Sequence, residues 1–374
     1  MTNLQAMFSQ ASLYNNGGQP LNWTTTGATS FNKLFSGATA FNQDVSSWDT
    51  SNVTNMSSMF WGASAFNNGD QPLNWNTSSV TNMGNMFWLA GGFNQDNSSW
   101  NVDSVTNFYL MFTGSTAFNN GGQPLSWSTP AATDMTAMFS NTAFNQDIST
   151  FNTSLITNMT AMFLNTPFNQ DISGWDVSSV VSMNVMFSGT TDFNNAGQPL
   201  NWNTANVTSI TDFTLMFNGV TLSDANYDAL LIGWDAQNLK PSESFDGGNS
   251  QYCTMAAQTA RTHMTDILLL GGDNWTITDG GLFSGTCGVL GLEDNELGSI
   301  LLYPNPVKDI LHIQSNNILE RIIMYDINGR VLQDIVVSGN KSQENISLTN
   351  LSSGMYFINT YSNKGQITKR IVKQ

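Results

Sequence analysis

The sequence predicts a repeat solenoid followed by a small antiparallel β-sandwich. Three observations support this fold class. The pair Met-Phe, written Leu-Phe in one copy, recurs nine times from residue 7 to residue 217, at intervals of 24 to 30 residues. Large apolar residues stand at fixed positions around each pair, with Asn, Ser and Thr between them. After residue 300 the pattern changes to strand-like alternation between turn dipeptides.

Each repeat of about 25 residues is expected to hold a short helix and a short strand or turn. In the third copy the apolar side chains fall on one helical face, at Val53, Met56, Met59 and Phe60. Ser51 and Thr54 would cap this helix. Residues 41–48 are too few and too polar for a helix and favour a strand or turn. One repeat cannot bury its apolar side, but stacked repeats form a continuous core with ladders of Asn, Ser and Thr.

Three rows of repeated side chains are candidates for ligand contact. A threonine row either faces a ligand or returns its hydroxyls to the backbone as caps, which we favour; it includes Thr54, Thr81, Thr106, Thr133 and Thr157. An aromatic row is either exposed for sugar stacking or buried in the core, and we favour the core; it runs through Trp23, Trp48, Trp75, Trp100, Trp127, Phe151, Trp175 and Trp202. Four carboxylates either cap turns, as we expect, or bind Ca²⁺; they are Asp44, Asp96, Asp147 and Asp171. No other cofactor is expected.

The motif around residues 41–60, with Phe-Asn-Gln-Asp, Trp and Val-Thr-Asn-Met-Ser-Ser-Met-Phe, resembles the BspA-like leucine-rich-repeat surface proteins, whose repeats occur in mycoplasma lipoproteins. The resemblance covers residues 1–219. It implies an elongated, leucine-rich-repeat-like solenoid on a bacterial surface, with adhesion as a proposed role of some members. It supplies no catalytic residue and no ligand, and Met replaces Leu at most core positions.

Charge and hydropathy exclude two classes of partner. Residues 1–290 hold 19 acidic side chains against Lys33, Lys240 and Arg261, and so carry the whole net charge of −16. Such a surface is a poor match for nucleic acid, because phosphate contacts need Lys and Arg. No apolar run is long enough to span a membrane. Met1 occupies a core position of a repeat and no signal peptide precedes it, so we expect a secretion signal and further repeats upstream.

After Phe217 the repeat period ends, and residues 220–287 are expected to cap the open end of the core. A helix near 224–235 would bury Tyr227, Leu230, Leu231 and Trp234 and begin at Ser223. A second helix is expected near 256–270, followed by a strand near 274–281. Cys253 and Cys287 flank much of this region and are expected to form a disulfide.

Residues 288–300 are expected to be a linker, and residues 301–374 a β-sandwich of short strands. This tail resembles the C-terminal sorting domain of the type IX secretion system of Bacteroidetes. The matching positions are Tyr303, Pro304, Asn305, Pro306, Asp326, Asn328, Gly329, Arg330, Leu351, Gly354, Met355, Tyr356, Lys369, Arg370 and Lys373. The resemblance implies contact with the secretion machinery and export to the cell surface.

The sequence therefore predicts a secreted, surface-attached binding or adhesion scaffold for an extracellular protein or glycan. A carbohydrate-binding module is the alternative, which exposed Trp would favour, and an ice- or mineral-surface binder is a third, which a flat outward Thr row would favour. The two histidines, His263 and His312, lie in different regions, so no acid, base and nucleophile come together. No catalytic activity and no metal centre are expected.

Overall fold

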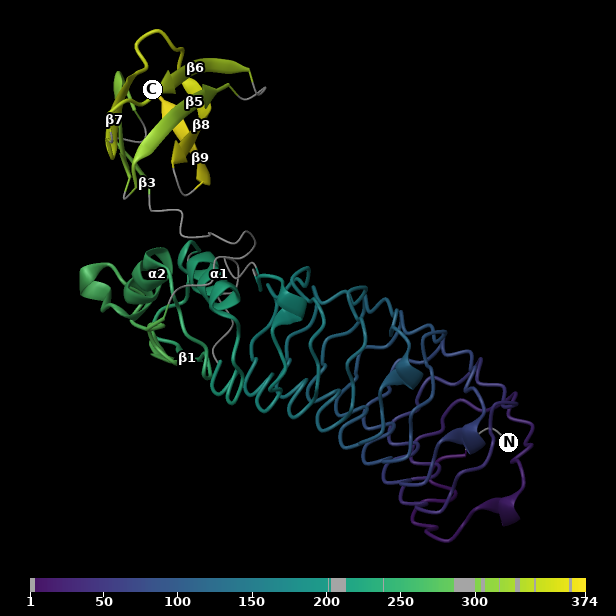
Figure 1. The fold of residues 1–374 in the computed structure, drawn as a ribbon. Helices are drawn as coiled ribbons and strands as arrows, with labels where there is room; N and C mark the ends of the chain where they lie inside the picture. Colours follow the sequence, from purple (N-terminus) through teal and green to yellow (C-terminus); the bar gives the residue numbers. More distant parts are fainter. Residues whose placement is uncertain are drawn as a thin grey trace. The chain divides into compact units, whose positions relative to one another are not determined.

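The fold is that of a repeat protein with few helices and with antiparallel sheets at its C-terminal end (Figure 1). The chain divides into two compact units, Met1–Gly288 and Val289–Gln374. The computed structural model describes residues 4–200, 202, 213–237, 239–285, 300–303, 307–315, 317–326, 330–339, 341–362 and 365–374. Most of the predicted linker at 288–300 lies outside these ranges.

Successive repeats lie side by side and are joined by a parallel backbone ladder (Figure 1). One residue of each repeat forms a parallel bridge to its counterpart in the next; the bridged residues are Ser30, Asn55, Asn82, Asn107, Asp134, Asn158 and Ser182. The longer repeats add a short 3₁₀ turn at Asn16–Gly18 (η1), Asn68–Asp70 (η2), Asn120–Gly122 (η3) and Asn195–Gly197 (η4).

The predicted helix in each repeat is wrong: the segment forms turns. Alternate N–H groups from residue 56 to 62 donate to the next repeat, as Phe60 does to the Met86 carbonyl at 2.8 Å. Between them, Met59 and Trp61 donate three residues back, as Met59 does to Met56 at 3.2 Å, and Ser57 donates to Oδ1 of Asn55 at 2.9 Å. The residue two before each core Phe also has a positive φ, 55° at Ser58, which a right-handed helix forbids. Bonds between repeats thus replace bonds within a helix.

The same positive φ occurs at Ala161, where it is 56°. We expect Ala161→Gly to stabilise the protein by about 1 kcal/mol, because glycine adopts this conformation without the Cβ penalty. In a helix the same change would cost about 1 kcal/mol. Urea denaturation of the two proteins distinguishes the cases by the sign of the change.

Aromatic columns fill the inside of the stack. Phe60 lies flat against Phe66 of its own repeat, with ring centroids 3.7 Å apart. It also stacks on Phe35 and Phe87 of the adjacent repeats, at 5.7 and 5.5 Å. All these rings are fully buried. The large apolar residues that recur in the sequence therefore stand in register and form one continuous core.

A ladder of asparagines runs along the stack and bonds to the backbone. In each repeat of the ladder this Asn follows the Phe that stacks on the Phe of the Met-Phe pair, as Asn67 follows Phe66. Its side-chain amide does not bond to the amide of the equivalent Asn in the next repeat. Instead Oδ1 of Asn42 accepts the backbone N–H of Asn67 at 2.7 Å, and Oδ1 of Asn67 accepts that of Asn94 at 2.9 Å. The pattern continues to Asn194 through Asn119, Asn145 and Asn169. These side chains satisfy backbone donors that turns leave without partners.

The cap closes the core with helix α1 (Asp224–Asp235), helix α2 (Met255–Thr265), the 3₁₀ turn η5 (Leu268–Leu270) and strands β1 (Ser244–Asp246) and β2 (Thr276–Thr278), which pair in parallel. The four apolar residues predicted for the buried face of α1 are fully buried, and Ser223 precedes the helix without a side-chain cap bond. Phe245 of β1 meets Phe217 edge-on, at 6.0 Å and 88°, and so ends the stacked column.

The C-terminal unit contains two antiparallel sheets. One has the order β3-β4-β7 and the other β6-β5-β8-β9. The strands are β3 (Ile300–Tyr303), β4 (Ile310–Ser315), β5 (Leu319–Tyr325), β6 (Val331–Val336), β7 (Gln343–Ser347), β8 (Gly354–Ser362) and β9 (Gly365–Lys373). Residues of both sheets, among them Leu311, Ile322 and Ile358, share one hydrophobic cluster. This unit thus has its own core.

Candidate functional site

The most distinctive surface feature is a pair of tryptophans directly after the Met-Phe pair of two adjacent repeats, Trp61 and Trp88. The other repeats carry smaller side chains there: Ser9, Ser36, Thr113, Ser140, Leu164, Ser188 and Asn218. The indole rings stack in parallel, with centroids 4.9 Å apart and planes 6° apart. Both side chains are half-buried.

These two indoles differ from the tryptophans of the core. Six buried indole N–H groups donate to backbone carbonyls at 2.6 to 3.1 Å; they belong to Trp48, Trp75, Trp100, Trp127, Trp202 and Trp275. Trp175 and Trp234 are buried without such a partner. Within the described ranges, the indole N–H groups of Trp61 and Trp88 have no protein acceptor either, but these rings reach the surface. Their donors are available to a ligand.

A groove of about 390 Å³ runs beside the pair and is lined from four consecutive repeats. Its lining comprises Asn32, Lys33, Ser57, Ser58, Trp61, Asn82, Gly84, Asn85, Trp88 and Asn107. The volume falls within the range of small-molecule sites.

Gly84 lines the groove without a side chain. At the same repeat position, three residues before the Phe of the Met-Phe pair, the flanking repeats carry Asn32, Ser57 and Tyr109. Gly84 is the only glycine at this position in the nine repeats. A Cβ at residue 84 would lie 3.2 Å from Oδ1 of both Asn82 and Asn107. The missing side chain therefore exposes the amides of the bridged ladder to the groove.

Hydrogen bonds orient these amides. Oδ1 of Asn82 accepts the N–H of Gly84 at 2.9 Å, and Oδ1 of Asn107 accepts the N–H of Tyr109 at 2.8 Å. No protein acceptor is recorded for either Nδ2 group among the residues that the structure describes. The groove is therefore rich in hydrogen-bond donors. Lys33, the only Lys or Arg of residues 1–219, lines it, and no carboxylate does.

The predicted threonine row is exposed along the stack, and its hydroxyls turn back to the backbone. Oγ1 of Thr81 donates to the Thr54 carbonyl at 3.2 Å, and Oγ1 of Thr106 donates to the Thr81 carbonyl at 3.3 Å. Thr54, Thr133 and Thr157 do the same to the repeat before them. The hydroxyls thus bond to the backbone, as favoured, but between repeats and not as helix caps.

The predicted aromatic row and aspartate row have structural roles. From Trp48 onward the described rings of the aromatic row are at most 5% exposed, so the exposed-Trp alternative does not hold at these positions. Each carboxylate of the aspartate row accepts the backbone N–H two residues ahead, at 2.8 to 2.9 Å in Asp44, Asp96, Asp147 and Asp171. These carboxylates therefore cap turns.

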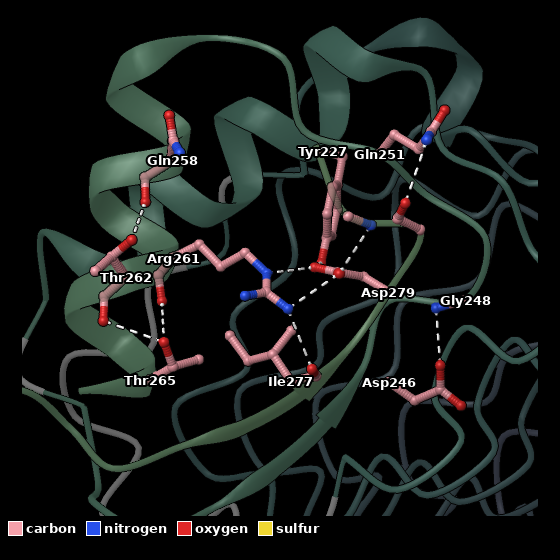
Figure 2. A network of polar contacts seen from close by, with 12 residues as sticks. Tyr227, Asp246, Gly248, Gln251, Gln258, Arg261, Thr262, Thr265, Ile277 and Asp279 are labelled. Atoms are coloured by element: carbon pink, nitrogen blue, oxygen red, sulfur yellow. Dashed lines mark hydrogen bonds and ion pairs between the residues drawn. The ribbon is translucent and has the colours of Figure 1, made fainter. Parts of the chain in front are cut away.

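A polar network holds the cap together (Figure 2). The guanidinium of Arg261 on α2 donates to both carboxylate oxygens of Asp279, at 2.8 and 3.1 Å. The phenol of Tyr227 on α1 donates to Asp279 at 2.7 Å. Burial, and then the negative charge of Asp279, raise the pKa of Tyr227 well above its ordinary value. Since these groups tie two helices to the segment after β2, the network is structural.

A second polar cluster joins Asp235, His263 and Asp273, whose ligand-type atoms lie within 4.8 Å of one another. Nδ1 of His263 lies 2.6 Å from Asp235, and Nε2 lies 2.9 Å from the Gly271 carbonyl. The hydrogen bond to Asp235 raises the pKa of His263. With both ring nitrogens engaged, the imidazole links α1, α2 and the loop after η5.

The predicted disulfide joins Cys253 to Cys287, and residue 287 lies outside the described ranges, so the pairing stays a prediction. Cys253 is half-buried, and its backbone N–H donates to Asp228 at 2.7 Å. We expect both cysteines of exported protein to resist thiol labelling until reduced. Cys253→Ser should lower the melting temperature, since closing the loop contributes roughly 3 to 4 kcal/mol. Two freely reactive thiols would overturn the pairing.

The tail residues that resemble the sorting signal occupy several strands. Tyr303 in β3 stacks on His312 at 5.3 Å, and Tyr356 in β8 is buried. Arg330 pairs with Asp326 at 3.1 Å. Gly354 opens β8, and Lys369 and Lys373 lie on β9. Pro304, Asn305, Pro306, Asn328 and Gly329 lie outside the described residues.

Sequence reasoning missed the groove, although a signal was present. Only two of the nine Met-Phe pairs are followed by Trp, and they belong to adjacent repeats. The second of these repeats also carries Gly84, at a position where no other repeat has glycine. These departures from the repeat lie at neighbouring positions, whereas the threonine, aromatic and aspartate rows recur along the stack and have structural contacts.

Comparison with known proteins shows a partial similarity to a curated protein. Beta-agarase A of Zobellia galactanivorans is 38% identical over 114 residues, which are 28% of this chain and 20% of that protein. The match therefore spans about a fifth of the relative's length. None of the helices in the described residues is both long and apolar enough to cross a bilayer.

Two families match the chain. The secretion system C-terminal sorting domain matches residues 301–374, and such a domain directs export by the type IX system to the cell surface. The family described as "Mycoplasma protein of unknown function, DUF285" matches three overlapping segments, 1–74, 70–142 and 123–230. Because these segments cover more than half of the chain, the protein belongs to this family of BspA-like surface repeat proteins.

Proposed function

We propose that the protein is a non-catalytic binding scaffold displayed on the cell surface, with its ligand site in the groove beside Trp61 and Trp88. The repeats act as a leucine-rich-repeat-like solenoid that holds the site rigidly, and the sorting domain delivers it to the exterior. The observation that carries the proposal is the stacked indole pair, half-buried, with no acceptor for either N–H group among the described residues.

The chemistry of the groove favours binding over catalysis. Its lining holds two serines and one lysine, but no carboxylate, imidazole or thiol. A serine nucleophile needs a neighbouring base, and a hydrolase of the acid–base type needs positioned carboxyl groups. The two histidines of the chain are His263 and His312, far along the sequence from the groove.

An array experiment tests the proposal. Full-length protein is applied to glycan and matrix-protein arrays beside a double variant, Trp61→Ser with Trp88→Ser. Serine stands at this position in the repeats of Ser36 and Ser140, so the variant should fold. Leu164→Ser changes the equivalent position of a distant repeat and is the matched control.

We expect a ligand that is retained by the wild type and by the Leu164→Ser control, and lost by the double variant. Absence of any ligand on either array would contradict the proposal. Release of cleaved products from a bound ligand would contradict its non-catalytic part.

The exposed threonine row favours a second candidate, a binder of ice or a mineral surface. The row is regular and outward over Thr54, Thr81 and Thr106, and its backbone ladder is continuous. Its hydroxyl protons, however, are donated to carbonyls of the preceding repeat. Thermal hysteresis, the lowering of the freezing point relative to the melting point, separates the candidates: ice binding requires it, and groove binding does not.

A further inference from the structure

We propose that the groove binds an extended, uncharged polysaccharide, with one sugar ring against the Trp61–Trp88 pair. This inference rests on the binding function proposed above and names its ligand class. A sugar ring has apolar C–H faces and a rim of hydroxyl and ether oxygens. A site for a sugar therefore needs an aromatic surface next to hydrogen-bond donors, close enough for one sugar ring to contact both.

The stacked pair supplies the aromatic surface. Because the two rings are parallel and 4.9 Å apart, they hold each other in place, and little side-chain entropy remains to be lost on binding. Stacked indoles at this position arise only where two adjacent repeats both carry Trp. The core rings, by contrast, are covered by the neighbouring repeats and offer no surface.

The donors around the pair match the acceptor oxygens of a sugar. The amide oxygens of Asn82 and Asn107 are held by backbone N–H groups, and neither Nδ2 group has an acceptor in the part of the chain that the structure describes, so both can donate to a ligand. The two indole N–H groups and the ammonium group of Lys33 add further donors on the same lining. Hydroxyl, ring and glycosidic oxygens can accept all of these bonds.

The extent of the groove points to a chain of sugars and not a single one. The lining residues come from four consecutive repeats, from Asn32 to Asn107. Repeats bridged as parallel strands are spaced by about 4.8 Å, so the lining spans about 14 Å along the stack. Affinity should therefore rise with oligosaccharide length and level off once the chain spans the lining.

The charge distribution favours an uncharged chain. Lys33 is the one cation of residues 1–219, and the ladder that forms the floor continues from Asn107 to a carboxylate at Asp134. Residues 1–290 carry the net charge of −16. A densely sulfated or uronate-rich chain would be repelled by this field at moderate salt. Lys33 then serves as a hydrogen-bond donor to a hydroxyl.

The test uses full-length protein and affinity electrophoresis in gels that contain agarose, a neutral β-glucan, alginate or a sulfated galactan. Agarose is included because the relative is a beta-agarase by name. Isothermal titration with an oligosaccharide length series of the polymer that retards the protein then gives affinities.

Two kinds of variant probe the groove. Trp61→Ser and Trp88→Ser each remove half of the aromatic surface. Gly84→Ser places a side chain at the floor of the groove. The preceding repeat carries Ser57 at this position, and its hydroxyl donates to Oδ1 of Asn55 at 2.7 Å, so the fold is expected to tolerate the change. Leu164→Ser is the control for stability and for the repeat position.

We expect retardation by a neutral polymer, roughly tenfold weaker binding in each Trp variant, and a comparable loss in Gly84→Ser. Leu164→Ser should bind as the wild type does. Preference for the charged polymers, or unchanged binding in the Trp and Gly84 variants, would overturn the inference. If a protein ligand from the matrix array binds and no glycan does, this inference fails while the proposed binding function stands; if nothing binds, both fail.

Discussion

Phe60→Ala is expected to lower the free energy of unfolding of the repeat unit by about 3 to 5 kcal/mol. Phe60 is fully buried and stacks on Phe35, Phe66 and Phe87, so truncation leaves a cavity among three rings of three repeats. The repeats on either side are held by their own backbone ladder and cannot collapse into it. Urea denaturation of full-length protein measures the change.

Ser57→Ala is the matched control, since Ser57 lies three residues away and its hydroxyl bonds to the side-chain amides of Asn32 and Asn55. It should cost roughly 1 kcal/mol or less. Hydrogen exchange should locate the damage of Phe60→Ala to about residues 31–90, because contacts in a stack are made between neighbours. Equal loss of protection in both units, or none, would show that the repeats do not stack as described.

Deleting residues 301–374 is expected to abolish surface display and to leave the protein in the periplasm. The sorting domain matches this whole segment, and its two sheets share their own hydrophobic cluster, apart from the core of the repeats. Protease accessibility on whole cells, compared with cell fractionation, measures the outcome. The Trp61→Ser, Trp88→Ser double variant is the control and should be displayed normally. Surface display of the truncated protein would contradict the assignment.

The sequence was sufficient for the repeat boundaries and the core. Residues at fixed repeat positions, such as Phe60, Phe66 and Trp75, are buried in register because stacking needs a large side chain there in every copy. It was not sufficient for the backbone. The spacing of Val53, Met56 and Phe60 suits a helix, but the same spacing suits a turn in which alternate N–H groups reach the next repeat. Hydropathy cannot distinguish these, because it does not show the positive φ at Ser58.

The rows considered as candidates for ligand contact make structural hydrogen bonds for a related reason. Repetition identifies what the stack requires, and the threonine and aspartate rows are repeated because their side chains satisfy backbone groups, as in Thr81 and Asp44. A ligand site on a repeat protein appears instead where the pattern is broken. Trp61, Gly84 and Trp88 are such breaks, and the structure brings them together on one groove.

The most direct test of the groove assignment is an ¹H–¹⁵N spectrum of the tryptophan indole groups during titration with the bound oligosaccharide. The chain has 11 tryptophans, and each indole N–H gives one signal. Single Trp→Phe replacements assign each signal to its residue. We predict that the signals of Trp61 and Trp88 shift with saturation, while those of Trp75, Trp100 and Trp127, whose N–H groups are bonded to core carbonyls, stay in place. Shifts of other indoles without those of Trp61 and Trp88, at a ligand concentration that saturates the protein, would contradict the account.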